Sequence, residues 1–226
     1  MKIKNIYSTT LSMFVLLALL ASCGLDNYDE PQSYLKGKIV YNGEAVNVRG
    51  TDERVRLQLY QDGYAYKNPI EIFVGQDGSF SAALFNGDYK LVTRDGNGPW
   101  VNSRDTTYIK VSGNTEMNFE VTPFFTISNA SITLSGNTVN ANFNINQIVN
   151  TAEIDRVIIL LNKTAFVDDD MRVQRVDFTD NLSTGAVSYS IELNDDAKKA
   201  NVLNARVCVW TKGADQGIYS PVINLK

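Results

Sequence analysis

The feature that most limits the fold is a two-residue alternation of apolar and polar side chains. In residues 54–60, Val55, Leu57 and Leu59 fall on one face of an extended strand, and polar side chains fall on the other. Similar short segments recur along the chain, separated by Asp-Gly, Asn-Gly and Gly-Asn turn signals. No long amphipathic helix is evident, so the pattern predicts an all-β protein built of two β-sandwiches in tandem.

The alternating segments form two groups that meet at Pro123. Proline lacks the amide donor that a central strand needs, so we place the domain boundary there and expect sandwiches over residues 34–122 and 123–226. Strands are expected in the first sandwich at residues 35–41, 54–60, 70–74, 79–84, 89–93, 107–111 and 117–121. In the second they are expected at residues 124–134, 139–145, 154–161, 171–178, 186–193, 203–211 and 218–225. About seven strands suit an immunoglobulin or fibronectin type III sandwich, and residues 194–201 are predicted to hold one helical turn capped by Asn194.

The N-terminus has the pattern of a lipoprotein export signal over residues 1–22. Lys2 and Lys4 precede a short apolar run, and small residues lead to Cys23. The run is too short for a membrane-spanning helix, which needs about 20 apolar residues. Cys23 is therefore predicted to carry lipid and to begin a tether over residues 23–33, the alternative being an ordinary secretory signal that contains a cysteine.

Composition excludes several classes of function. Without residues 1–22 the protein has 19 Lys and Arg against 25 Asp and Glu, a formal charge of −6, which argues against a nucleic-acid partner. The chain contains no histidine, so Ser-His-Asp and Cys-His nucleophilic sites and the usual histidine-bearing zinc sites are excluded. Cys208 lies in a strand-like apolar run and is predicted to be a buried, unreactive thiol.

Three segments carry a resemblance to a known fold: residues 37–46 (GKIVYNGEAV), 55–63 (VRLQLYQDG) and 75–92 (GQDGSFSAALFNGDYKLV). Their order resembles the carboxypeptidase-regulatory-like or transthyretin-like sandwich of bacterial surface proteins. In that resemblance Gly78 and Gly87 allow reversals of the chain, and Phe80 and Tyr89 pack the core. These are folding residues, so the resemblance implies a fold and no catalytic site.

The signal, the tether, the first sandwich and the FFTISNASITLSGNTVNANFNI opening of the second resemble a two-domain lipoprotein family of unknown function from Bacteroidetes. The resemblance implies an association with SusC-like and SusD-like outer-membrane glycan importers. Asp26, Asp29 and Glu30 also resemble the acidic tag of surface-exposed lipoproteins in that group. We therefore expect an outer-membrane protein held by its lipid anchor and facing the cell exterior.

Aromatic residues in loops are the candidates for carbohydrate binding. Trp100 follows a Gly-Pro turn and offers a flat face to a sugar ring if it is exposed, although packing over the end of the first sandwich is the favoured alternative. Tyr64 and Tyr66 follow the Asp62-Gly63 turn and form a second candidate platform. The alternative for this pair is that one ring packs inside.

Asp168, Asp169 and Asp170 form the densest acidic cluster. Three carboxylates offer ligands for calcium, but the spacing lacks the central glycine and distal glutamate of a known calcium loop. A solvated loop is the preferred interpretation, and no metal or other cofactor is expected.

These observations favour a non-enzymatic, surface-anchored accessory lipoprotein of a polysaccharide uptake system that binds carbohydrate. The alternative is a structural or docking module that contacts an outer-membrane importer. A carboxylate glycosidase, which needs two acids facing each other across a pocket, is the least favoured hypothesis. The sequence identifies neither the glycan, nor the binding face, nor the oligomeric state.

Overall fold

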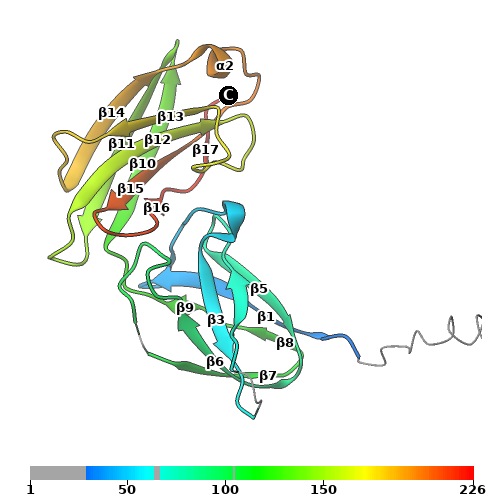
Figure 1. The fold of residues 1–226 in the computed structure, drawn as a ribbon. Coiled ribbons are helices and arrows are strands. Elements are labelled where there is room, and N and C mark those ends of the chain that lie inside the picture. The colour runs from blue at the N-terminus through cyan, green and yellow to red at the C-terminus, as the bar shows by residue number, and fades with distance from the viewer. Residues whose placement is uncertain (1–28, 64–66, 104) are drawn as a thin grey trace, which may run out of the picture. The chain divides into compact units, whose positions relative to one another are not determined.

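The computed structural model describes residues 29–63, 67–103 and 105–226. The chain divides into two units, Met1–Pro31 and Gln32–Lys226, and the second unit contains both β-sandwiches (Figure 1). In these described residues, no helix has the length and apolar character needed to cross a membrane. The expectation of an all-β fold with two tandem domains is confirmed.

One sheet of the first sandwich is organised around its first strand, β1. Strands β5 and β2 pair with β1 in antiparallel fashion, whereas β8 and β9 pair with it in parallel. The bounds are β1 Ser33–Tyr41, β2 Glu44–Ala45, β5 Ser79–Leu84, β8 Asn114–Glu116 and β9 Phe119–Glu120. Gly37 in β1 lies against the backbone carbonyl of Met117, where any Cβ would collide. A glycine at this position therefore lets the returning chain approach β1.

The other sheet of the first sandwich has the antiparallel order β4-β3-β6-β7. Its strands are β3 Arg56–Tyr60, β4 Ile70–Phe73, β6 Gly87–Thr93 and β7 Thr107–Val111. Leu57 and Leu59 of β3 and Leu91 of β6 are fully buried, as the alternation predicted. Phe80 and Tyr89 are also buried, in agreement with their expected packing role.

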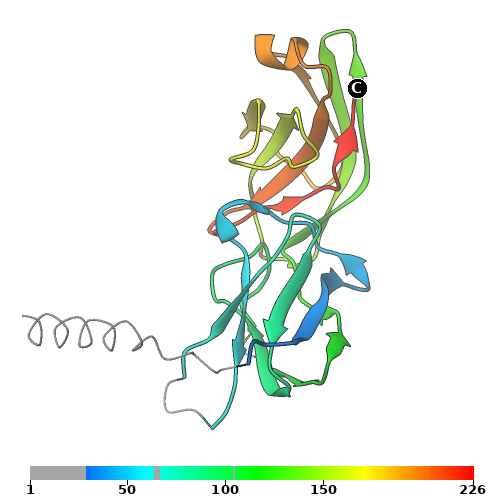
Figure 2. The same ribbon diagram turned by 90° about the vertical axis from the view of Figure 1, so that its right-hand side faces the viewer.

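The second sandwich packs a three-stranded sheet, β10-β11-β14, against a sheet with the order β13-β12-β15-β16, in which β17 also pairs with β15. The bounds are β10 Phe125–Ser135, β11 Thr138–Gln147, β12 Ile154–Asn162, β13 Gln174–Phe178, β14 Gly185–Glu192, β15 Asn204–Thr211, β16 Ile218–Tyr219 and β17 Ile223–Asn224. Figure 2 shows the green strands β10 and β11 in one layer and the red-orange strand β15 in the other. The last predicted strand is interrupted at Pro221, which cannot donate to a sheet.

The turn and capping residues behave as the sequence predicts, with one exception. Gly78 has a φ of 76°, and a Cβ there would collide with the carbonyl oxygen of Val46, so glycine is required. Gly87 begins β6 and is not among the glycines of positive φ in the described residues, so the expected left-handed turn is absent there. Helix α2, Asp195–Lys198, begins as predicted, with the Asn194 side chain accepting from the Ala197 amide at 2.8 Å.

Candidate functional site

Arg206 on β15 joins the two sandwiches through its buried guanidinium. Its Nη2 donates to the backbone carbonyl of Gln76 at 3.0 Å, and its Nη1 donates to those of Val48 at 3.3 Å and Val167 at 3.1 Å. The side chain is 0 % exposed, and burial lowers the pKa of Arg206 to about 10. The group is still protonated at neutral pH. Carbonyl acceptors from both sandwiches therefore surround a buried cation.

Asp168 makes a second connection between the sandwiches. Its carboxylate accepts from the backbone amides of Gly50 at 3.1 Å and Thr51 at 2.9 Å, and from the Thr51 hydroxyl at 3.0 Å. It also accepts from the amides of Asp170 and Met171 in its own loop. A short 3₁₀ turn of the first sandwich, η1 Thr51–Glu53, is fixed against the second sandwich in this way.

The neighbours of Asp168 extend this contact. Asp170 pairs with Arg49 of the first sandwich, while Asp169 pairs with Arg175 of β13 at 2.8 Å. The Gln76 amide donates to the carbonyl of Ala165 at 2.8 Å, so it holds the same loop. Because the Arg49–Asp170 and Gln76–Ala165 interactions cross between the sandwiches, as those of Asp168 do, the contact between them is expected to be rigid.

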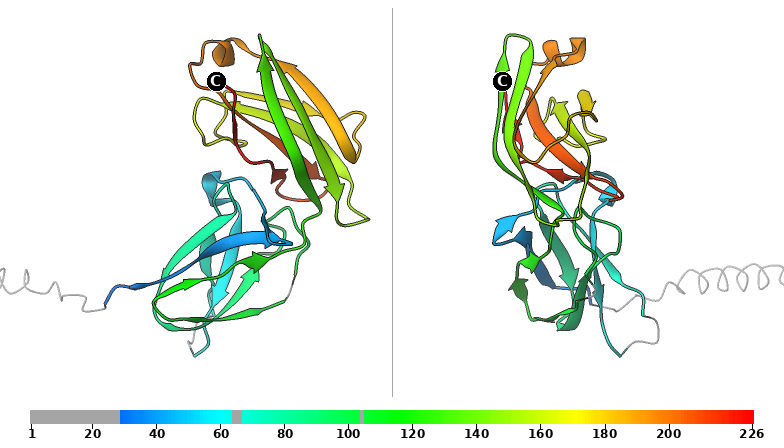
Figure 3. Two further views of the ribbon diagram at one scale, coloured as in Figure 1. Left: turned by 180° about the vertical axis from the view of Figure 1, so that it is seen from behind. Right: turned by 90° about the vertical axis from the view of Figure 1, so that its left-hand side faces the viewer.

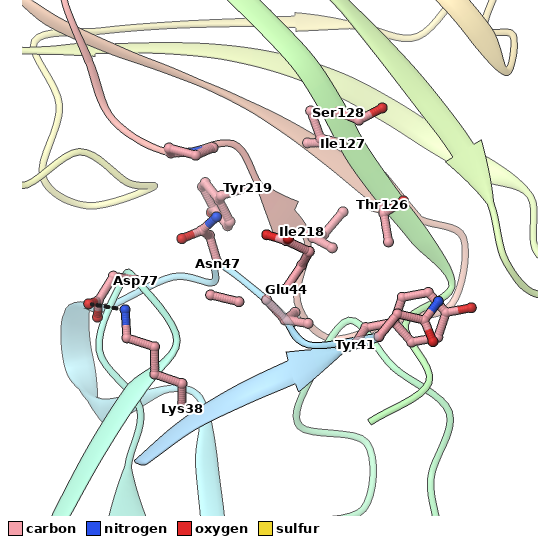
Figure 4. A pocket seen from close by; sticks show the side chains of 14 residues that line it. Lys38, Tyr41, Glu44, Asn47, Asp77, Thr126, Ile127, Ser128, Ile218 and Tyr219 are labelled. Atoms are coloured by element: carbon pink, nitrogen blue, oxygen red, sulfur yellow. Dashed lines mark ion pairs between the residues drawn. The ribbon is translucent and has the colours of Figure 1, made fainter. Parts of the chain in front are cut away.

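A groove of about 550 Å³ lies beside this contact (Figure 4). Residues from β1, the β1–β2 turn and β2 line one side, and residues from β10 and β16 line the other. The lining comprises Lys38, Tyr41, Asn42, Glu44, Ala45, Val46, Asn47, Asp77, Thr126, Ile127, Ser128, Ile218, Tyr219 and Pro221. Concave sites of this size between domains are a common location for ligand binding.

The side of the groove formed by the first sandwich is held by a tight hairpin. Asn42 and Gly43, both with positive φ, connect β1 to β2, and the Asn42 amide donates to Glu120 at 2.6 Å. This turn places the partly exposed ring of Tyr41 beside Thr126 of β10 at one end of the groove. An aromatic face next to hydroxyl and amide groups is an arrangement that can stack on a sugar and bond its hydroxyls.

An ion pair between Lys38 and Asp77 lies at the opposite end of the groove, with 3.6 Å between the charged atoms (Figure 4). The pKa of Asp77 is lowered, first by the hydrogen bond from the Ser79 hydroxyl and then by the Ser79 amide and Lys38. Glu44 is the third charged residue of the lining, which therefore carries one cation and two anions. The remaining polar groups are neutral amides and hydroxyls.

Tyr219 forms part of the groove wall and is almost fully buried. Its backbone amide donates to the carbonyl of Asn47 at 3.0 Å, and its ring lies 4.6 Å from the guanidinium of Arg206. Burial raises the pKa of Tyr219 well above its ordinary value. The residue that lines the groove is thus fixed by the same cation that joins the sandwiches.

Trp100 requires a correction to the hypothesis of an exposed sugar platform. The residue is 2 % exposed and belongs to the hydrophobic core, and the flat side of its ring lies over Gly98. The adjoining backbone pairs with the segment at Pro123. The alternative of an inward-packed indole is therefore the one observed, since removal of a large aromatic surface from water is favourable.

The acidic cluster also requires a correction. Asp168 and Asp169 are 0 % and 6 % exposed, so the preferred interpretation of a solvated loop is wrong for these two residues, while Asp170 is exposed. The weak calcium hypothesis finds no support either, because the described residues contain no group of three or more acidic, cysteine or histidine residues placed to hold a metal ion. Backbone amides and arginines neutralise the carboxylates instead.

Three other predicted residues, Tyr64, Tyr66 and the lipidation candidate Cys23, lie outside the described residues. Of the sequence candidates that the structure describes, neither Trp100 nor Asp168, Asp169 and Asp170 lines the groove. Its lining residues were missed because they are ordinary strand and turn residues in the sequence. The Asn-Gly turn after Tyr41 and the Asp77-Gly78 turn gave local signals, and both indicated chain reversals rather than a site.

The fold and groove define a class of two-sandwich protein with a cleft at the contact between its domains. Residues 33–122 match the domain described as "Protein of unknown function (DUF3823) N-terminal domain", and residues 125–224 match "Domain of unknown function (DUF3823_C)". A solved DUF3823 protein from Parabacteroides merdae is 52 % identical, with a TM-score of 0.83, over 88 % of this chain and 100 % of that one. The chain therefore belongs to the DUF3823 family.

Other solved structures share the fold. A DUF3823 protein from Bacteroides ovatus is 36 % identical with a TM-score of 0.79, covering 86 % of this chain and 98 % of that one. A "putative carbohydrate binding protein" from Bacteroides uniformis is 16 % identical with a TM-score of 0.72, covering 87 % of this chain and 99 % of that one. At that identity the likeness concerns the fold alone. No curated protein matches the sequence.

Proposed function

We propose that this protein is a non-enzymatic, surface-anchored lipoprotein that binds carbohydrate in the groove between its two sandwiches. The observation that carries the proposal is the groove itself, in which Tyr41 lies beside amide and hydroxyl groups and opposite Glu44, at a contact between the sandwiches held by Arg206 and Asp168. The B. uniformis protein of the same fold, described as a "putative carbohydrate binding protein", is a supporting analogy. The absence of histidine from the sequence favours binding over nucleophilic catalysis.

Carbohydrate binding is tested with residues 32–226. The solved P. merdae relative matches 88 % of this chain over its own full length, so a protein of about this length folds without the N-terminal segment. Affinity gels and calorimetry with a panel of plant and host polysaccharides should reveal saturable binding. Tyr41→Ala should weaken it by about tenfold or more, which corresponds to about 1.4 kcal/mol. Tyr108→Ala is the matched control, because Tyr108 is 76 % exposed on β7 and does not line the groove.

The result is decisive in either direction. No binding to any polysaccharide would overturn the proposed function. Binding that Tyr108→Ala removes and Tyr41→Ala leaves unchanged would place the site on the first sandwich, away from the groove.

The anchor is the second component of the proposal. Lipid on Cys23 would hold the protein in the outer membrane, facing the cell exterior, since two or three acyl chains bind a membrane far more firmly than one. Cell fractionation should show that Cys23→Ala releases the protein from the membrane, and surface proteolysis of intact cells should digest the anchored form. A membrane-bound Cys23→Ala protein would contradict the anchor.

Docking onto a SusC-like or SusD-like importer is the alternative function, and one surface favours it. Tyr60, Lys90 and Tyr108 lie side by side across β3, β6 and β7 on the outer face of the first sandwich. Lys90 lies 5.8 Å from the Tyr108 ring, and Phe73 is 41 % exposed on the same sheet. Aromatic residues of this kind are enriched at protein interfaces. Co-purification of an outer-membrane barrel that Tyr108→Ala abolishes would support docking.

A further inference from the structure

The outer face of β10-β11-β14 has an unusual composition. We call it the amide face, and its residues, assigned by strand register, are Thr126, Ser128, Ser131, Thr133, Asn140, Asn142, Asn144, Asn146, Ala186, Ser188 and Ser190. Every one of these residues is uncharged, and all but one carry a hydroxyl or a side-chain amide. Ser135, Thr138 and Glu192 continue the same face at its far end, where the Glu192 carboxylate accepts from the Thr138 hydroxyl. Figure 3, left, shows this sheet with the green strands β10 and β11 nearest the viewer.

Strand β11 explains how the sequence produces this face. Its buried residues are Val139, Ala141, Phe143 and Ile145, and an asparagine follows each of them. Because successive side chains of a strand point to opposite faces, the four asparagines form one outward row. At about 3.4 Å per residue the row is roughly 20 Å long. A single sugar ring is much shorter than this row.

The hydrogen bonds of the amide face leave its centre available. Asn146 donates to the hydroxyls of Thr126 and Ser128 at 3.1 and 3.0 Å, and Ser190 donates to Asn140 at 2.8 Å. Within the described part of the chain, the side-chain amides of Asn142 and Asn144 have no hydrogen-bonding partner. Each can donate and accept at once, as a sugar hydroxyl also does.

The amide face is continuous with the groove. Thr126 and Ser128 belong to both, because β10 is the edge strand of its sheet and borders the groove. A chain molecule seated beside Tyr41 therefore meets the amide face where it leaves the groove over β10. Continuity of this kind suits a polymer better than a compact ligand.

The charged residues of the groove and of the sheet that carries the amide face limit the class of glycan that can bind. The outer face of β10-β11-β14 carries no cation, its one charged residue in register being Glu192 at the far end. The groove has a single lysine, already paired with Asp77, against two acids. A sulfated or uronic-acid glycan would meet no free cation along this path, so its charges would lose hydration without compensation. Neutral sugars carry no such cost.

We infer that a neutral polysaccharide chain binds in the groove and continues over the amide face. This inference rests on the proposed function and specifies its ligand class and the extent of the site. Its consequence is that affinity should rise with chain length beyond the oligosaccharide that fills the groove. The amide face should supply that increase.

The test uses residues 32–226 with two sets of probes. The neutral set is a xylan, a mannan, a starch and a β-glucan with their oligosaccharide length series, and the anionic set is a pectin and a sulfated glycosaminoglycan. Calorimetry should show binding to a neutral glycan, with at least tenfold higher affinity for long oligosaccharides than for short ones. The Asn142→Ala/Asn144→Ala double variant should lose the additional affinity for long oligosaccharides and keep the affinity for short ones. Asn201→Ala, at an exposed asparagine outside both surfaces, should behave as wild type.

Each alternative outcome has a distinct meaning. Equal affinity for short and long oligosaccharides, an unchanged length dependence in the double variant, or preferential binding of the anionic set would overturn this inference while carbohydrate binding itself stands. The absence of binding to every glycan would overturn the proposed function as well. A membrane protein that co-purifies with wild type and is lost from the double variant, without glycan binding, would identify the amide face as a protein-docking surface instead.

Discussion

The guanidinium of Arg206 in the second sandwich donates to the backbone carbonyl of Gln76 in the first at 3.0 Å, with the arginine fully buried. Nη1 of the same group bonds Val48, and Nε bonds Ser220 at 2.8 Å. One side chain thus satisfies carbonyls from both sandwiches. The groove owes its shape to this contact, because Tyr219 of its wall packs against the same guanidinium.

Arg206→Ala is expected to destabilise the protein by roughly 3 kcal/mol or more, since several buried carbonyls lose their donor at once. Chemical denaturation of residues 32–226 measures the change. Arg172→Ala removes an exposed arginine and is the control, with an expected effect within about 0.5 kcal/mol. Equal unfolding free energies for the two variants would show that Arg206 does not join the sandwiches.

Asp168→Ala should cost about 1–3 kcal/mol, because the amides of Gly50 and Thr51 lose a charged acceptor. Hydrogen exchange should show faster exchange at those two amides in the variant. Asp196→Ala, in an exposed position of α2, should leave both stability and exchange unchanged. Protection of Gly50 and Thr51 that survives in Asp168→Ala would exclude the contact.

Asp177 on β13 should contribute a pH-dependent part of the stability. Its pKa is lowered from the ordinary 3.8, first by the hydrogen bond from Arg175 and then by the charges of Arg175 and Arg156. A lowered carboxylate pKa stabilises the fold above the unfolded-state pKa, and that stabilisation disappears as the pH falls through the folded-state value. Asp177→Asn should therefore be less stable than wild type at neutral pH, by at most about 1 kcal/mol for this partly exposed pair.

The difference between Asp177→Asn and wild type should shrink as the pH falls below 3.8, and urea titrations over an acid pH series measure it. A difference that stays constant down to the acid limit would show that the charge of Asp177 does not contribute.

Cys208 should not react in the folded protein. It is 0 % exposed on β15, and burial raises the pKa of its thiol. Within residues 32–226 it is the single cysteine, so a thiol reagent should label nothing under native conditions and one group per chain in denaturant. Rapid labelling of the native protein would mean that β15 opens readily.

Local sequence patterns predict most of the fold. The strand at residues 79–84 was predicted with the bounds of β5, and the helical turn at Asn194 has its expected cap. Both depend on neighbours in sequence, through alternation and capping. The parallel pairing of β1 with β8 and β9 was not predicted, because it joins segments about 80 residues apart.

The site was far less predictable, for the same reason. Asp168 looks like part of a solvated acidic run until Gly50 and Thr51, more than 100 residues away, are placed beside it. Arg206 is a lone charge in an apolar strand run and has to find partners when it is buried, but no site was predicted from it. Trp100 was a candidate for an exposed binding residue because it lies in a loop, yet a large aromatic residue in a loop can belong to the core.

A crystal structure of residues 32–226 with a bound neutral oligosaccharide tests the central claim most directly. The account predicts a sugar ring stacked on Tyr41 in the groove, with the next sugars crossing Thr126 and Ser128 toward Asn144. Sugar bound on the outer face of β3, β6 and β7, around Tyr108, with the groove empty would contradict it.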